Sequence, residues 1–351
     1  MENYIDKLDD KIRKYFSILS KEFPNFLLEY INTPVMQKQA GISVSCGTYY
    51  SKMYNQMWYS SLDHSIAVAL IIWNFTKDKK QTLAGLFHDI ATPVFKHSID
   101  FMNKDYEKQE STEELTKQKI IDSKEIMELL KRDGINIEEV CDYHIYPIAD
   151  NDTPMLSSDR LEYTLSNALG ATERLWDLEE IDKIYNDIEK QKNENGIDEL
   201  GFKTKEIAEE FVHIMSELSC LYRRDKTVYS MQFLADTMKK MSDQKLITID
   251  DLYTLTEKEI IEKIENCKDI KISEDFKKWK CCKAIKTSNI CPENVYFVNI
   301  EKNKVRYINP LVKINNTYRR IKDISNSAKL DIQKTFDYKI SKYIYIDNDC
   351  I

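Results

Sequence analysis

Apolar residues recur at helical spacing along most of the chain. In residues 4–21 they stand at Ile5, Leu8, Ile12 and Leu19, which makes one side of a helix apolar. The same periodicity predicts further helices over residues 63–76, 79–89, 95–103, 110–131, 159–169, 175–193, 203–221, 228–242 and 256–265. We therefore expect a mainly helical fold.

The pattern changes after Cys282. Residues 294–312 are aromatic and β-branched, with charged and polar residues around Lys302–Asn303, and this predicts a β-hairpin that turns there. Residues 338–346 are a further strand candidate. We expect four parts: an N-terminal helix (1–29), a helical domain (30–220), a helical extension (221–282) and a small α+β appendage (283–351).

Composition excludes several classes of protein. The net charge of −8 disfavours nucleic acid as a partner, although the basic, aromatic tract 306–322 keeps that alternative open. Only 7 of 351 residues are glycine, and none forms a GxGxxG or GxxxxGK[ST] motif, so a glycine-cradled nucleotide site is not expected. The longest apolar run, Ile66–Trp73, is too short to span a bilayer. The charged N-terminus does not resemble a signal peptide, and we expect a cytoplasmic protein.

The eight cysteines offer one alternative metal site. Cys267, Cys281, Cys282 and Cys291 lie close in sequence, but their spacing matches no common zinc ribbon and no histidine lies nearby. Reduced thiols are the interpretation that we favour.

The histidines are the stronger signal for chemistry. Of only five, His64 begins one apolar helix and His88, followed by Asp89, ends the next, so that an antiparallel pair of helices would bring them together. Asp159, in the first turn of a later helix, could complete the group, with Asp150 and Asp152 as rival fourth ligands. Two imidazoles and two carboxylates suit a divalent ion. Taken singly, each residue could equally be an ordinary polar residue at a helix end.

Four blocks in the same order resemble a known family. They are residues 30–37 (YINTPVMQ), His64, residues 84–100 (AGLFHDIATPVFKHSID) and residues 157–165 (SSDRLEYTL). Together they resemble the HD superfamily of metal-dependent phosphohydrolases, and most of all its deoxynucleoside triphosphate triphosphohydrolase-like branch. The resemblance implies that His64, His88, Asp89 and Asp159 bind one divalent metal ion (Mn, Fe, Ni, Zn or Mg).

The chain also departs from that branch. Thr92 replaces a histidine, Gln109 replaces the catalytic histidine, Ser61 replaces a phosphate-binding arginine and Asn167 replaces an acid that contacts the sugar, whereas the tyrosine remains as Tyr163. These changes leave two alternatives. The protein is a phosphohydrolase that acts on a nucleotide or other small phosphorylated substrate through a metal-activated water, or it is a non-hydrolytic regulator that binds metal and nucleotide.

For the enzyme we expect particular roles. His97 is the candidate general acid or phosphate contact, and Asp100, three residues on, is its orienting partner. Arg160 and Tyr163 are candidate substrate-binding residues, and Lys96 is expected on a solvated helix face.

Two further histidines and two general properties complete these expectations. His144 could help to bind a second metal, but a single ion is favoured, and His213 is expected to be structural. Members of the family often form homo-oligomers, and no membrane partner is expected.

Overall fold

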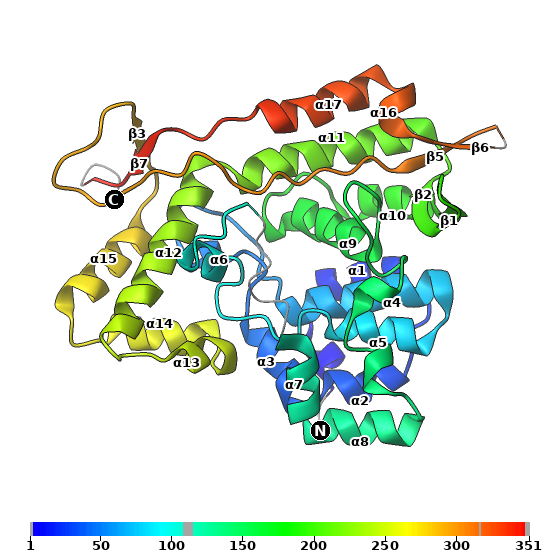
Figure 1. The fold of residues 1–351 in the computed structure, drawn as a ribbon, viewed down its shortest axis with the longest axis horizontal. Coiled ribbons are helices and arrows are strands. Elements are labelled where there is room, and N and C mark those ends of the chain that lie inside the picture. The colour runs from blue at the N-terminus through cyan, green and yellow to red at the C-terminus, as the bar shows by residue number, and fades with distance from the viewer. Residues whose placement is uncertain (1–2, 108–114, 316, 348–351) are drawn as a thin grey trace.

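A buried helix, α4 (Ser61–Thr76), lies at the centre of the fold. The computed structural model describes residues 3–107, 115–315 and 317–347 (Figure 1). Every residue of α4 from Ser61 to Ile72 is buried, because apolar side chains occupy almost its whole circumference. The helix begins at a capping box, in which the Ser60 hydroxyl accepts from the Asp63 amide and the Asp63 carboxylate accepts from the Ser60 amide.

The next helix, α5 (Lys79–Phe87), packs closely against α4. Asp78 caps its start by accepting hydrogen bonds from the amides of Lys80 and Gln81. Gly85 permits the close approach, since a β-carbon at this position would overlap the Ile72 side chain. The short connection makes the two helices antiparallel, so that the last residues of α5 come beside the first turn of α4.

Further helices surround this pair. Before α4 and after α5 they are α1 (Asp10–Leu19), α2 (Phe26–Ile31), α3 (Pro34–Lys38), α6 (Ser98–Met102), α7 (Thr116–Asp122), α8 (Lys124–Asp133), α9 (Ser158–Ser166), with a π-helical turn at Asn167–Ala171, and α10 (Leu178–Asn186). The later helices are α11 (Lys205–Tyr222), α12 (Asp225–Asp243), α13 (Ile249–Thr254), α14 (Glu257–Glu265), α15 (Ile270–Cys281), α16 (Ile321–Ile324) and α17 (Asn326–Asp337). Short 3-10 turns lie at Tyr4–Lys7, Gln39–Gly41, Thr48–Tyr50, Ile137–Glu139 and Tyr143–Ile145.

Two small sheets complete the fold. In the first, the strand order is β1 (Ile188–Lys192), β2 (Asp198–Phe202), β5 (Leu311–Ile314) and β6 (Thr317–Arg320). Its β2 and β5 are parallel, so the C-terminal region adds strands to a hairpin formed more than a hundred residues earlier. In the second, β7 (Tyr343–Tyr345) lies between β3 (Lys286–Ser288) and β4 (Phe297–Val298).

The C-terminal region belongs to two hydrophobic cores. Ile308 and Val312 pack into the core formed mainly by the helices from α1 to α11. Val298 and Ile344 pack into a second core, which contains α12, α14 and α15. The four-part division of the chain stays a prediction.

The mainly helical fold with small sheets is confirmed, but several predicted elements differ. The hairpin predicted over 294–312 is wrong: residues 301–310 form no strand, and the paired strands β5 and β6 turn at Asn315, whose φ of 55° suits asparagine. The helix predicted over 175–193 ends at Asn186, and β1 follows it. The sequence pattern predicts no helix at the positions of α2, α3, α13, α15, α16 and α17.

The long helix predicted over 110–131 is also different. Its described part is two helices, α7 and α8, because Ser123 leaves the helical conformation and caps α8 by accepting from the Ile126 amide. Residues 110–114 lie outside the described part of the chain. Among the described residues, no helix combines the length and the apolar character that crossing a membrane requires.

A buried ion pair joins β6 to the hairpin β1–β2. The Arg320 guanidinium contacts both carboxylate oxygens of the fully buried Glu199, at 2.6 and 2.9 Å. Arg320→Leu would leave the Glu199 charge buried and unpaired, so we expect it to lower the free energy of unfolding by about 3–5 kcal/mol. Urea denaturation followed by circular dichroism measures this loss. Arg319→Leu, at the exposed neighbouring position, is the control and should change stability little; equal losses in the two variants would contradict the prediction.

Candidate metal centre

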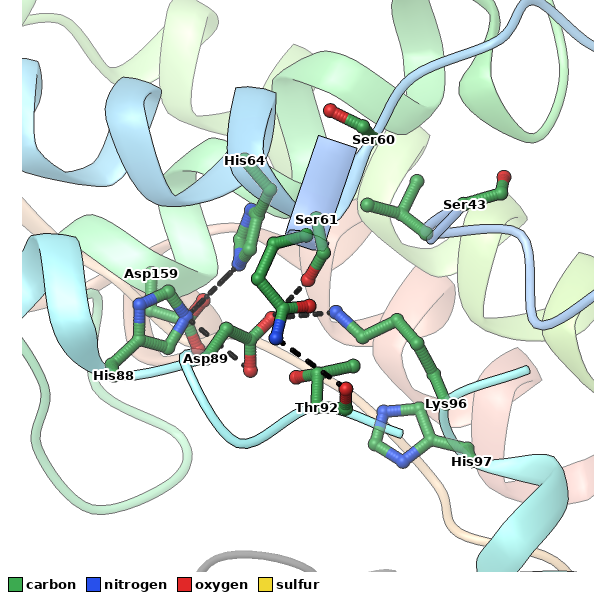
Figure 2. A network of polar contacts seen from close by, with 12 residues as sticks. Ser43, Ser60, Ser61, His64, His88, Asp89, Thr92, Lys96, His97 and Asp159 are labelled. Atoms are coloured by element: carbon green, nitrogen blue, oxygen red, sulfur yellow. Dashed lines mark hydrogen bonds and ion pairs between the residues drawn. The ribbon is translucent and has the colours of Figure 1, made fainter. Parts of the chain in front are cut away.

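The helix pair α4–α5 brings two imidazoles together. His64 lies in the first turn of α4 and His88 directly follows α5. Their Nε2 atoms are 3.2 Å apart, and Figure 2 shows the two rings converging from different elements. The predicted meeting of the two helix ends is therefore what the structure shows.

The other ring nitrogens determine where the protons lie. His88 Nδ1 is 2.8 Å from the Gly85 carbonyl oxygen, which can only accept, so Nδ1 carries a proton. His64 Nδ1 likewise contacts a carboxylate oxygen of Glu162. If both rings are neutral, both Nε2 atoms present lone pairs to each other at 3.2 Å, which is repulsive. A positive charge between or on the rings removes this repulsion.

The electrostatics of His64 favour such a positive charge. Burial disfavours a charged ring, but the carboxylates of Glu162 and Asp159 outweigh it and raise the pKa of His64 to about 10. The site is therefore arranged to hold a cation, whether a proton or a metal ion.

Two carboxylates complete the cluster. Asp159 Oδ1 is 3.1 Å from His64 Nε2 and 3.7 Å from His88 Nε2. Asp89 Oδ1 is 3.8 Å from His88 Nε2. Burial would raise the pKa of each carboxyl, but for Asp89 the charge of Lys96, and for Asp159 the hydrogen bond and charge of His64, hold the pKa below its usual range. Both groups are thus ionised at neutral pH.

These separations fit a metal ion. Ligand atoms at about 2.1 Å from a cation lie about 3 Å apart when adjacent and about 4 Å apart when opposite in an octahedron. The four distances above, 3.1, 3.2, 3.7 and 3.8 Å, fall in that range. Among the described residues, one group of possible ligands has atoms that all lie within 4.8 Å of one another, and it consists of His64, His88 and Asp89. Asp159 is not a member of that group, although its Oδ1 lies close to both imidazoles. The residues present fit a divalent ion.

Lys96 is part of this cluster, which corrects the expectation of a solvated position. Its side chain is only 12% exposed, and its Nζ lies 2.6 Å from Asp89 Oδ2, which also accepts from the Ser61 hydroxyl at 3.2 Å. Both Phe95 and Lys96 have positive φ, and this turn directs the lysine inward. Lys96 and Ser61 occupy one carboxylate oxygen of Asp89 and leave the other to face the histidines.

Glu162 is the residue that sequence reasoning missed. It is fully buried in α9 and accepts hydrogen bonds from Tyr15 (3.1 Å) and Tyr59 (2.7 Å) besides its contact with His64. One signal could have revealed it: an acid three residues after Asp159 lies on the same face of the helix. A carboxylate behind a histidine fixes the ring orientation and strengthens it as a metal ligand.

The cluster opens into a cavity of about 450 Å³. His97, Tyr163, Arg160 and Asn167 line it, as do His64, His88, Asp89 and Asp159. The residues predicted for metal and for substrate thus share one cavity.

His97 and Asp100 form the predicted pair. His97 Nδ1 is 2.9 Å from Asp100 Oδ2, and Asp100 is fully buried. Burial lowers the pKa of His97, the hydrogen bond to Asp100 opposes this, and the charges of Arg306 and Lys96 lower the pKa further. Since Nδ1 donates to the carboxylate, Nε2 is the atom that remains for a ligand. In Figure 2 the His97 ring lies beyond Lys96, apart from the two histidines of the cluster.

Arg160 and Tyr163 are placed differently from each other. The Arg160 guanidinium donates to the carbonyl oxygens of Met155 and Asn151 and lies 3.1 Å from Asp150 Oδ1, so it holds the cavity wall together. Tyr163 lines the cavity, where burial raises the pKa of its hydroxyl to about 12. Their substrate-binding role stays a prediction.

The remaining histidines lie at other places. His144 Nε2 is 3.4 Å from Asp150 Oδ2, and its Nδ1 is 2.9 Å from Asp142 Oδ1. Asp150 is thus engaged by His144 and Arg160, while Asp159 lies against the histidines of the cluster. His213 contacts Asp331 of α17 at 3.2 Å on the surface.

Two replaced family positions and the cysteines were also singled out by the sequence. Asn167 donates to the Tyr163 carbonyl oxygen at 2.6 Å, and Gln109 lies outside the described residues. The seven cysteines of the described part of the chain are free thiols, and no group of them gathers as metal ligands would.

Comparisons with known proteins agree with this picture. The HD domain family matches residues 61–187. The uncharacterized protein YdhJ of Bacillus subtilis is 22% identical over 336 residues, which cover 91% of this chain and 94% of YdhJ. The metal-dependent phosphohydrolase cns2 of Cordyceps militaris is 26% identical over 109 residues, or 31% of each chain.

Two solved structures share the fold. A hypothetical protein from Aquifex aeolicus superposes with a TM-score of 0.64 at 19% identity, over 93% of this chain and 94% of the other. A phosphohydrolase from Bacteroides thetaiotaomicron superposes with a TM-score of 0.62 at 14% identity, over 92% and 96%. At these identities the likeness concerns the fold alone. The residues that match the HD domain family, 61–187, include all four residues of the cluster.

Proposed function

We propose that the protein hydrolyses a phosphate ester or anhydride of a small phosphorylated substrate, with a divalent metal ion held by His64, His88, Asp89 and Asp159. The observation that carries this proposal is the pair of Nε2 atoms 3.2 Å apart, with one carboxylate oxygen of Asp159 close to both. The similarity to a relative named as a metal-dependent phosphohydrolase supports it.

A bound divalent ion would lower the pKa of a water molecule toward about 7 and polarise a phosphoryl oxygen. The chain's own residues prepare the site for this. Glu162 holds the His64 ring from behind, and the Gly85 carbonyl holds the His88 ring, so that both Nε2 atoms point inward. Lys96 neutralises part of the negative charge on Asp89, which limits the repulsion of an incoming phosphate.

His97 is the general acid in this proposal. In the absence of substrate its lowered pKa leaves the ring neutral near pH 7, with Nε2 as an acceptor. A phosphate dianion in the cavity would favour the charged ring, because opposite charge stabilises the protonated form. The imidazolium then donates from Nε2 to the phosphate or to the leaving oxygen, while Asp100 keeps its orientation.

The substrate class is proposed more broadly than a deoxynucleoside triphosphate. Ser61 and Asn167 replace family contacts to phosphate and sugar, and both bond within the chain, to Asp89 and to the Tyr163 carbonyl oxygen. Arg160 is engaged by its own loop. A nucleotide stays one candidate, since Tyr163 offers an aromatic wall.

One prediction of this proposal concerns the four proposed ligands. His88→Ala and Asp159→Ala should each reduce bound metal from about one ion per chain to about a tenth of that, and abolish turnover, because each removes a ligand of the ion. Elemental analysis and a panel of phosphomonoesters and nucleotides, assayed with Mn²⁺, Mg²⁺, Co²⁺ and Ni²⁺, measure both effects. The surface variant His213→Ala is the matched control and should retain metal and turnover.

Two outcomes would contradict the proposal. Full metal content in either variant would exclude the assigned ligands. Nucleotide binding without turnover under any of these metals would favour the alternative, a regulator that binds metal and nucleotide.

Another prediction concerns Glu162. Glu162→Gln keeps the size of the side chain and removes the charge behind His64, so metal affinity should fall about 10–100-fold while the fold is retained. A Mn²⁺ titration at constant pH measures the affinity. Glu179→Gln, at an exposed position of α10, is the control. Unchanged Mn²⁺ affinity in Glu162→Gln would show that Glu162 does not support the metal centre.

A further inference from the structure

Two tyrosines from the segment before the HD domain match lie close to the metal cluster. Tyr15 belongs to α1 and Tyr59 lies two residues before α4, so both precede residue 61, where the match begins. Their rings are fully buried and pack edge to face, with centroids 6.3 Å apart. Because α1 packs against α4, the N-terminal part of the chain reaches the neighbourhood of His64 (Figure 1).

The two hydroxyls converge on one oxygen of Glu162. Tyr15 donates to Glu162 Oε1 at 3.1 Å, and Tyr59 donates to the same oxygen at 2.7 Å. The other oxygen, Oε2, contacts His64 Nδ1 and accepts from the Ser166 hydroxyl at 3.3 Å. A carboxylate oxygen has two lone pairs, so two hydroxyls saturate Oε1 and leave Oε2 to the histidine. The tyrosines therefore determine which oxygen of Glu162 faces the imidazole.

Both tyrosines keep the proton that they donate. Burial and, after it, the charge of Glu162 raise the pKa of each hydroxyl well above its usual range. Glu162 is itself fully buried, and a buried carboxylate persists as an anion only where hydrogen bonds or opposite charges satisfy it. The two hydroxyls supply this on Oε1, and His64 supplies it on Oε2.

We propose that Tyr15 and Tyr59 are positioning residues of the metal centre, which act on the ion through Glu162 and His64. By holding the carboxylate against rotation they fix the plane of the His64 ring, so that its Nε2 stays directed at His88 and Asp159. This inference rests on the proposed function, because it requires a metal ion at His64. It gives α1, which lies outside the HD domain match, a part in metal binding.

A purely structural role makes a different prediction. The loss of any buried hydroxyl that donates a hydrogen bond lowers stability, whether or not the residue serves the metal centre. Tyr30 offers the comparison, since its ring is also fully buried and its hydroxyl donates to a carboxylate oxygen, Asp133 Oδ2, at 2.7 Å. Neither Tyr30 nor Asp133 contacts a residue of the metal cluster in any listed bond of its hydroxyl or carboxylate, so Tyr30→Phe is the matched control.

Mn²⁺ titration of the whole 351-residue chain at constant pH, with urea denaturation of the same samples, separates the two roles. Tyr59→Phe removes one oxygen atom and keeps the ring, and should weaken Mn²⁺ binding about threefold to tenfold, because Glu162 is held less firmly behind His64. Tyr15→Phe, which loses the longer hydrogen bond, should weaken it about twofold to fivefold. Tyr30→Phe should also lose stability but should bind Mn²⁺ as wild type does.

A double-mutant cycle shows whether the tyrosines act through Glu162. In the Glu162→Gln background, Tyr59→Phe should change the Mn²⁺ affinity less than about twofold, because the group that it positions is already altered. A loss of affinity as large in that background as in wild type would overturn the inference.

The remaining outcomes separate this inference from the proposed function. If His88→Ala binds Mn²⁺ as tightly as wild type, or neither binds it, the proposed metal site fails and the inference about the tyrosines fails with it. If Mn²⁺ binding depends on His88 but Tyr15→Phe and Tyr59→Phe bind Mn²⁺ as wild type does, or are weakened no more than Tyr30→Phe, only the positioning role is overturned. Each single variant decides this on its own.

Discussion

The facing nitrogens of His64 and His88 are the constraint on which the rest of the site depends. If both imidazoles are neutral and their Nδ1–H groups are used in hydrogen bonds, their Nε2 lone pairs face each other at 3.2 Å. A positive charge on or between the rings is needed to remove this repulsion. The fold enforces this approach. α4 is buried on nearly every side, and Gly85 lets α5 pack directly against it, so neither ring can move away without disturbing the core.

Charge around this contact is balanced by buried partners. Glu162 is stabilised by two tyrosine hydroxyls, and Asp89 shares its outer oxygen with Lys96. Buried ions persist in proteins only when they are paired and hydrogen-bonded. Protein groups thus satisfy the outer carboxylate oxygens of the cluster, while the two Nε2 atoms face one another and one oxygen each of Asp89 and Asp159.

The cavity is completed by residues far from the HD domain in sequence. Two contacts connect the C-terminal region to the loop that precedes α9. The Asn309 amide donates to the Pro154 carbonyl oxygen, and Glu199, which pairs with Arg320, accepts from the Leu156 amide. The similarity to YdhJ extends over nearly the whole of both chains, whereas the HD domain match ends at residue 187. The cavity is thus bordered by residues within the HD domain match and by residues more than a hundred positions after its end.

Much of the helical fold could be predicted from the sequence, and so could the meeting of His64 with His88 and Asp89. Both follow from local rules, because apolar spacing sets where a helix begins and ends, and a short connection makes neighbouring helices antiparallel. Residues 301–310, by contrast, belong to a stretch that is rich in aromatic and β-branched residues, and such composition favours a strand. Only the packing of distant elements decided that these residues line a cavity and pair with no strand. The burial of Lys96 and the position of Glu162 behind His64 were decided in the same way, since charged residues are placed inside a protein only where tertiary structure supplies their partners.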